Sequence, residues 1–159
     1  MSKSGERRFV QSPDDQELIP GAAETLQRYR DDGWVMAIAS NQGGVAAGFK
    51  TLESAIAETR YAMKLCKIKN ALIAPSFESN GLGLAYHILP KSLRRSVFEI
   101  KDLRERFRKP APGMLLYLFP EISERLYVGD RPEDKEAAVN AGILFMDAVE
   151  WRCSSPSLA

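Results

Sequence analysis

The stretch that decides the fold is residues 128–134, which read VGDRPED. An apolar run ends there in a glycine, and two carboxylates, Asp130 and Asp134, follow four residues apart. Pro132 suits the first position of a helix, which is expected to run to Gly142. Because open α/β sheets build their sites at the carboxyl ends of strands, the acids predict a site for a hard cation such as Mg²⁺. Two acids that merely stabilise a helix N-terminus fit this stretch equally well.

Short apolar runs alternate with amphipathic segments along the rest of the chain. Strands are expected at residues 34–39, 71–74, 126–128 and 143–146. Helices are expected at residues 22–31, from a cap at Thr51 onward, and at 112–119. Residues 76–93 have no clear period and predict a loop or a short hairpin. This alternation, with short connections, predicts an α/β fold with a mostly parallel sheet.

The composition fits a single domain over residues 1–159, with flexible ends at 1–8 and 150–159. Hydrophobic residues make up 45% of the chain, which is enough for a core, and 22 basic residues nearly balance 21 acidic ones. The formal net charge of +1 gives no general electrostatic case for binding nucleic acid or membranes. The basic run within residues 94–109 is more often a solvated face than a binding surface.

The two cysteines, Cys66 and Cys153, lie far apart and form no CxxC pair. They predict neither a disulfide framework nor a zinc site, and they fit a reducing, cytoplasmic location. His87 is expected to be a loop or hairpin residue rather than a zinc ligand, because no cysteine lies near it. No apolar run approaches the length that spans a membrane, so no membrane partner is expected.

Polar residues flank the expected strands at two further places. Ser40 and Asn41 follow one buried strand, and Lys109 precedes a helix between prolines that stiffen the backbone. A hydroxyl, backbone amides, a fixed ammonium and a metal site together suit a phosphate group, whose oxygens carry the charge that phosphoryl transfer must stabilise. Taken singly, Ser40 is more readily a strand-ending cap, and Lys109 a surface lysine.

The order of these motifs resembles that of the haloacid dehalogenase superfamily of phosphatases. The matching strings are ELIPG at 17–21, ASNQG at 39–43, RKPAPGM at 108–114, VGDRPED at 128–134 and NAGI at 140–143. They are most similar to subfamily IIIA, the capless or small-cap branch, with histidinol-phosphate, heptose-bisphosphate and polynucleotide 3′-phosphatases. The resemblance covers residues 9–147. It implies a Rossmann-like three-layer sandwich and hydrolysis of phosphate esters through a phosphoaspartyl intermediate with Mg²⁺.

The resemblance also implies a role for each matching position. Ser40 would donate its hydroxyl to the substrate phosphate, with the backbone amide of Asn41 beside it. Lys109 would be catalytic, binding the phosphate and offsetting charge near the nucleophile. Asp130 would bind Mg²⁺, and Asp134 would bind it or orient a bound water molecule.

One part of the family pattern does not occur in this sequence. The first motif, a strand that ends in Asp-x-Asp-Gly-Thr and carries the nucleophile, has no match. Asp14 and Asp15 follow a proline without an apolar strand ahead of them, so they are expected to be loop residues. In the family that strand is central, between the strands that end at Ser40 and Val128. Its absence would leave two edges with unpaired backbone groups.

These observations lead to one main expectation and one alternative. The main expectation is a Mg²⁺-dependent phosphomonoester hydrolase that is truncated at its N-terminus, with Met1 an internal start, and that lacks its nucleophile. Its substrate would be a phosphorylated small molecule or a nucleic-acid 3′-phosphate end. The alternative is a catalytically inactive family member that acts as a binding module, pairing an exposed strand edge with another chain or with itself.

Overall fold

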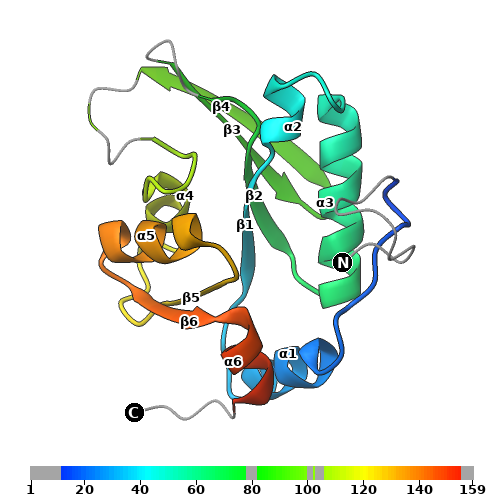
Figure 1. Ribbon diagram of the computed structural model, residues 1–159, viewed down its shortest axis with the longest axis vertical. Helices are drawn as coiled ribbons and strands as arrows, with labels where there is room; N and C mark the ends of the chain where they lie inside the picture. The colour runs from blue at the N-terminus through cyan, green and yellow to red at the C-terminus, as the bar shows by residue number, and fades with distance from the viewer. Residues whose placement is uncertain (1–11, 78–81, 100–101, 103–105, 155–159) are drawn as a thin grey trace.

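The computed structural model describes residues 12–77, 82–99, 102 and 106–154 (Figure 1). In this part of the chain, helices and strands alternate. The helices are α1 (Ala22–Asp31), α2 (Gly43–Ala46), α3 (Leu52–Cys66), α4 (Gly113–Tyr117), α5 (Pro132–Ala141) and α6 (Ala148–Cys153). The strands are β1 (Ala37–Asn41), β2 (Asn70–Ala74), β3 (Leu82–Leu89), β4 (Ser92–Glu99), β5 (Leu126–Gly129) and β6 (Leu144–Asp147).

The strands form two separate sheets. Four of them pair in the order β1-β2-β3-β4, with β1 and β2 parallel and the β3–β4 hairpin antiparallel to β2. The other sheet is the parallel pair β5–β6, which lies beside the lower part of β1 in Figure 1. Among the described strands, none pairs with the outer edge of β1 or with the second edge of β5. The α/β fold is therefore confirmed.

Strand β2 is buried on both faces, as its continuous apolar sequence predicts. Ala71 and Ile73 point to one face, where they pack with residues of α3 and β3 such as Met63. Leu72 and Ala74 point to the opposite face, where the packing cluster includes residues of α4. Helices therefore cover both faces of the sheet, and the layers are helix, sheet and helix (Figure 1).

Sequence signals mark two helix ends correctly. Thr51 caps α3, because its hydroxyl oxygen accepts a hydrogen bond from the Ser54 amide at 3.1 Å. Gly142 ends α5 in the left-handed conformation, at φ 68°, which glycine adopts without a steric penalty.

The structure differs from the expected elements at three places. Strand β1 spans Ala37–Asn41, so Ser40 and Asn41 are strand residues and not part of a turn. Residues 82–99 form two eight-residue strands where a loop or a short hairpin was expected. The hairpin is long because β3 pairs with β2 and contributes Ile88 to the buried cluster there. Tertiary packing, rather than local periodicity, stabilises it.

Residues 150–153, for which a flexible end was expected, belong to α6. Trp151 packs against Tyr29 of α1 with ring centroids 5.8 Å apart, and the Thr25 hydroxyl donates to the Arg152 carbonyl at 3.1 Å. The expectation for residues 1–8 lies outside the described part of the chain, as do residues 155–159. Within the described part, each helix is too short or too polar to cross a membrane.

Candidate functional site

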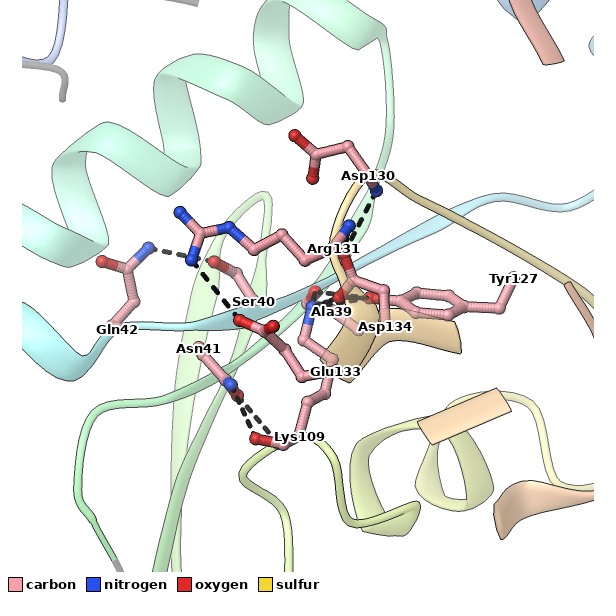
Figure 2. A network of polar contacts seen from close by, with 10 residues as sticks. All are labelled: Ala39, Ser40, Asn41, Gln42, Lys109, Tyr127, Asp130, Arg131, Glu133 and Asp134. Carbon is pink, nitrogen blue, oxygen red and sulfur yellow. Dashed lines mark hydrogen bonds and ion pairs between the residues drawn. The ribbon is translucent and has the colours of Figure 1, made fainter. Parts of the chain in front are cut away.

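The carboxyl ends of β1 and β5 meet at the side chain of Lys109, which enters from the loop before α4 (Figure 2). The Lys109 ammonium donates three hydrogen bonds. Its acceptors are the Asp134 carboxylate at 2.6 Å, the Tyr127 hydroxyl at 2.6 Å and the Ala39 carbonyl at 3.1 Å. Only 9% of the Lys109 side chain is exposed. The lysine that the sequence placed before a helix is therefore not a surface lysine, because it joins the two strand ends.

Asn41 fixes the backbone of Lys109. Its side-chain amide donates to the Lys109 carbonyl at 3.0 Å, and its side-chain oxygen accepts from the Lys109 amide at 2.9 Å. The Asn41 side chain thus bonds to both backbone groups of Lys109, as a neighbouring strand does in a β-sheet. The Asn41 side chain thus positions the lysine. The proposed contact of the Asn41 backbone amide with phosphate stays a prediction.

Ser40 lies one residue earlier on β1, and Figure 2 shows it among the same group of side chains. Its hydroxyl oxygen accepts a hydrogen bond from the Gln42 side-chain amide at 3.1 Å. Because that bond uses a lone pair, the hydroxyl proton of Ser40 can still be donated to an anion. The position of Ser40 at a strand end agrees with the role that the sequence suggests for it.

Asp134 is a buried carboxylate whose two oxygens both accept hydrogen bonds. Oδ1 accepts from Lys109 and from the Tyr127 hydroxyl, and Oδ2 accepts from the amides of Asp130 and Arg131 at 3.3 and 3.2 Å. Burial raises the pKa of Asp134, but the Lys109 ammonium, the Tyr127 hydroxyl and the Arg131 amide outweigh burial and hold that pKa below its ordinary value. The group is therefore an anion in the folded protein at neutral pH.

Gly129 permits this arrangement by lacking a side chain. A Cβ atom at position 129 would lie 2.4 Å from the Asp134 Cβ and 2.6 Å from its Oδ2. Real Cβ atoms do not approach that closely. The glycine that precedes the first acid of the sequence motif therefore allows the second acid to fold back against the strand end.

The two acids do not form a magnesium site by themselves. Asp130 is exposed, whereas the Asp134 oxygens are already engaged in four hydrogen bonds. The described residues contain no group of three or more side chains that could hold a metal ion. Mg²⁺ takes six oxygen ligands in near-octahedral geometry, and with one accessible carboxylate most of them would be water molecules. The predicted metal-binding role of Asp130 and Asp134 stays a prediction that needs a further ligand.

Tyr127 belongs to the site, although the sequence did not single it out. Its hydroxyl lies 2.6 Å from the Lys109 ammonium and 3.1 Å from Asp134 Oδ1. Burial, and secondarily the Asp134 carboxylate, raise the pKa of Tyr127 well above its ordinary value, so the phenol stays neutral. A tyrosine within an apolar strand is expected to be a core residue. The sequence feature that could have indicated a role in the site is its position three residues before Asp130.

Arg108 provides a second cation near the end of β1. Its guanidinium lies 4.8 Å from the centre of the Phe77 ring and 2.9 Å from the point where a Cβ of Gly43 would be. A side chain at position 43 would therefore displace the guanidinium. Gly43, the first residue of α2, thus makes room for a positive charge, which favours an anionic ligand there.

Comparisons with known proteins agree with this fold. A family model described as polynucleotide kinase 3 phosphatase matches residues 1–147. D-glycero-beta-D-manno-heptose-1,7-bisphosphate 7-phosphatase of Escherichia coli (strain K12) is 27% identical over 139 residues, which cover 85% of this chain and 67% of that protein. D-glycero-D-manno-heptose-1,7-bisphosphate 7-phosphatase of Thermosynechococcus vestitus is 26% identical over 140 residues, 84% of this chain and 67% of that protein.

A solved structure is similar in fold. The D,D-heptose 1.7-bisphosphate phosphatase from B. bronchiseptica, complexed with magnesium and phosphate, superposes with a TM-score of 0.62 at 22% identity. The match covers 86% of this chain and 69% of that one. The fold and these matches define a haloacid dehalogenase-like phosphatase. Within that class, the chain belongs to the polynucleotide kinase 3 phosphatase family, which confirms the resemblance seen in the sequence.

Proposed function

We propose that this site binds the phosphate group of a phosphomonoester, as one half of a Mg²⁺-dependent phosphatase site. The observation that carries the proposal is the Lys109 ammonium, which is buried, held by three acceptors and fixed through its backbone by Asn41. The positive charge is in place before the ligand arrives, and one N–H of Lys109 can donate to a phosphoryl oxygen once it leaves its present acceptor. The Ser40 hydroxyl, at the end of the same strand as Asn41, supplies a neutral donor.

The described residues supply recognition of phosphate rather than a complete catalyst. In the proposed reaction a carboxylate attacks phosphorus, but Asp134 uses both of its oxygens in hydrogen bonds and Asp130 is the accessible acid near it. We assign neither of them as the nucleophile. With Asp130 as its accessible carboxylate, a bound Mg²⁺ would take most of its other ligands from water and from the substrate phosphate. We therefore expect the 159-residue chain to bind phosphate and to hydrolyse phosphate esters poorly or not at all.

Two substrate classes follow from the comparisons. The family name points to polynucleotide 3′-phosphates, and the names of the relatives point to phosphorylated sugars. Salt dependence separates them, because a polynucleotide releases counterions on binding and its affinity falls steeply with salt. A phosphorylated sugar lacks that extended charge, so its affinity would respond less to salt. We favour the phosphorylated small molecule because the net charge of the chain is only +1.

The direct test is binding of inorganic phosphate, measured by calorimetry. Lys109→Met should weaken binding at least about tenfold, since a hydrogen bond to a charged group contributes about 1.5–3 kcal/mol. Lys135→Met, which removes an exposed lysine from the adjoining helix, is the matched control and should leave binding unchanged. Because Lys109→Met also leaves Asp134 without its cation, Ser40→Ala is a second test and should weaken binding by a smaller factor. Equal phosphate affinity in all four proteins would overturn the proposal.

Hydrolysis is tested separately with a generic aryl phosphate and Mg²⁺. We expect no release of phosphate above background from the wild-type chain. Release that Ser40→Ala and Lys109→Met both abolish would show that this site is catalytic in the 159-residue chain and would overturn that expectation. An alternative function is a binding module without catalysis, which would require no phosphate binding. It is favoured by the edges of β1 and β5 that pair with none of the described strands.

A further inference from the structure

One face of the β3–β4 hairpin carries apolar side chains that are open to solvent. Directly opposite residues of an antiparallel pair point to the same face, so the face that holds the buried Ile88 also holds its partner Leu93. Because alternate residues of a strand share a face, Leu82 and Val97 lie there too. Leu82, Leu93 and Val97, which we call the hairpin patch, are 45%, 41% and 53% exposed. Apolar side chains gathered on one exposed face are typical of an interaction site.

Helix α3 covers this face of the sheet only as far as β3. Its Met63 shares a buried cluster with Ile73 of β2, and that cluster reaches Ile38 of β1 on one side and Ile88 of β3 on the other. Strands lie about 4.8 Å apart and packed helices about 8–10 Å apart, so a helix beside α3 would lie roughly two strands from β2, over β4. In Figure 1, α3 is at the right and the open end of the hairpin extends to the upper left, away from it. The exposure of the hairpin patch shows that no described helix covers β4 on this face.

The side of α3 that faces the hairpin is positively charged. Arg60, Lys64 and Lys67, which we call the cation row, are exposed and follow at spacings of four and three residues, so they lie on one side of the helix. That side faces the hairpin, because the cation row lines a depression of about 360 Å³ together with Leu89 and Pro90 at the β3–β4 turn. The described residues that line this depression include no acid.

Arg95 adds a positive charge within the hairpin patch. It is exposed and lies between Leu93 and Val97 along β4, on the same face. The ion pairs that the described residues form involve other cations than Arg95 and the cation row. Cations gathered without carboxylate partners favour an anionic ligand. The surface over β4 therefore combines an apolar floor with basic side chains in it and along one border.

We propose that this surface binds an acidic amphipathic helix of another protein, which lies beside α3 on the same face of the sheet. Its apolar side packs on the hairpin patch, and its carboxylates pair with Arg95 and with the cation row. A helix is the complementary element because helices packed side by side cover the faces of α/β sheets. The proposal does not depend on the phosphatase function, because helix binding is measured without a phosphate ester.

Charge and side-chain type favour this partner over two others. A second copy of the chain in a two-fold dimer would bring the same surface against itself, so that Arg95 and the cation row would meet cations. A single nucleic-acid strand would stack its bases on exposed aromatic side chains. The hairpin patch is aliphatic, and Tyr86, which lies on the same face of the hairpin, is buried.

The first experiment measures binding of a fluorescein-labelled peptide by fluorescence anisotropy. The probe contains four copies of the unit Leu-Glu-Glu-Leu, so its leucines recur at helical spacing. A control peptide has the same residues in strict alternation, which is a strand pattern. We expect saturable binding of the probe to the full chain, and binding of the control peptide that is at least about tenfold weaker. No binding of the probe, or equal binding of both peptides, would overturn the proposal.

Variants of the protein test the charges and the apolar floor separately. Lys64→Glu and Arg95→Glu should each weaken probe binding at least about threefold, because an attraction becomes a repulsion. Lys135→Glu makes the same change in charge on an exposed position of α5 and should leave binding unchanged. Val97→Ser should also weaken binding, whereas Val139→Ser, at an exposed valine of α5, should not. Probe affinity that is unchanged in Lys64→Glu and Val97→Ser would overturn the proposal.

Two further measurements test the other occupants. Fluorescein-labelled oligothymidine that binds more tightly than the peptide, and that Arg95→Glu releases, would assign the surface to nucleic acid. A dimer in analytical ultracentrifugation that Val97→Ser dissociates would assign it to a second copy of this chain. Either result would overturn the proposed partner. We expect a monomer that binds oligothymidine more weakly than the peptide.

Discussion

Lys109 and Asp134 form a buried ion pair, with 2.6 Å between the ammonium nitrogen and the carboxylate oxygen. Their side chains are 9% and 7% exposed, although one residue lies before α4 and the other in the first turn of α5. The pair connects the loop that follows the hairpin to the C-terminal sheet. It should contribute more to stability than the pair Arg131–Glu133, whose charged groups are 3.4 Å apart and open to solvent.

Removal of the buried carboxylate should destabilise the protein strongly. Asp134→Ala leaves the Lys109 ammonium without its anion and two backbone amides without an acceptor, and we expect the free energy of unfolding to fall by about 3 kcal/mol or more. Glu133→Ala, one residue away, should change it by less than about 0.5 kcal/mol. Urea denaturation of both variants measures the difference. Similar midpoints for the two would contradict a central role of the pair.

Gly129 should not tolerate a methyl group. Gly129→Ala places a Cβ 2.4 Å from the Asp134 Cβ, and the strand end or α5 must move to relieve this contact. We expect a loss of about 1–3 kcal/mol in unfolding free energy, as for other overpacked sites. Gly44→Ala is the control, because its Cβ would meet the Lys50 side chain at 3.5 Å, an ordinary contact distance. Thermal melts compare them, and a Gly129→Ala protein as stable as Gly44→Ala would show that the site adapts.

The single histidine makes stability depend on pH in a defined direction. Burial, and secondarily the charge of Arg94, hold the pKa of His87 below its ordinary value of 6.5 in the folded protein. Because the unfolded chain takes up the proton more readily, this group contributes stability that is fully present above pH 6.5. The contribution is lost as pH falls from there through the lower folded pKa.

The measurement for His87 is the free energy of unfolding in urea between pH 5 and pH 8, for the wild type and for His87→Gln. The wild type should lose stability on acidification below about pH 6.5, whereas the variant should change less over the same range. No other histidine in the chain contributes to this interval. Parallel curves for the two proteins would show that the environment of His87 in β3 does not shift its pKa.

Mg²⁺ should bind this chain weakly. Asp130 is the accessible carboxylate of the pair, and most of the inner sphere of the ion would remain water. Titration calorimetry should therefore give shallow heats that Asp130→Asn removes. Tight binding of one equivalent would mean that a further carboxylate completes the site, and would restore Asp134 as a metal ligand.

The sequence predicted the parts of this structure that local chemistry determines. The cap at Thr51, the glycine end of α5 and the doubly buried strand β2 all follow from short-range patterns. The resemblance implied that Lys109 and Asp134 belong to one site, and their charged groups lie 2.6 Å apart. The order of the motifs in the sequence identified the family, which the family model confirms.

Other features depend on contacts between residues that lie far apart in the sequence, so short-range patterns do not predict them. Tyr127 looks like a core residue until its hydroxyl is seen beside Lys109, and the Asn41 side chain bonds to a backbone 68 residues away. Helix α6 has six residues, and so short a helix depends on tertiary contacts such as Trp151 with Tyr29. The length of the β3–β4 hairpin was not predicted, because the exposed outer strand, with Arg94 and Arg95, does not alternate regularly between apolar and polar residues.

The division into two sheets has a consequence for local unfolding. A parallel pair such as β5–β6 is only marginally stable on its own, and its connection to the rest depends largely on packing of α4 and α5 and on the site residues. Backbone amides of β5 and β6 should therefore exchange with deuterium sooner than those of Leu72 and Ile73 in the middle of the larger sheet. Hydrogen exchange mass spectrometry resolves the two groups. If the C-terminal sheet opens first, the protein folds as two cooperative units.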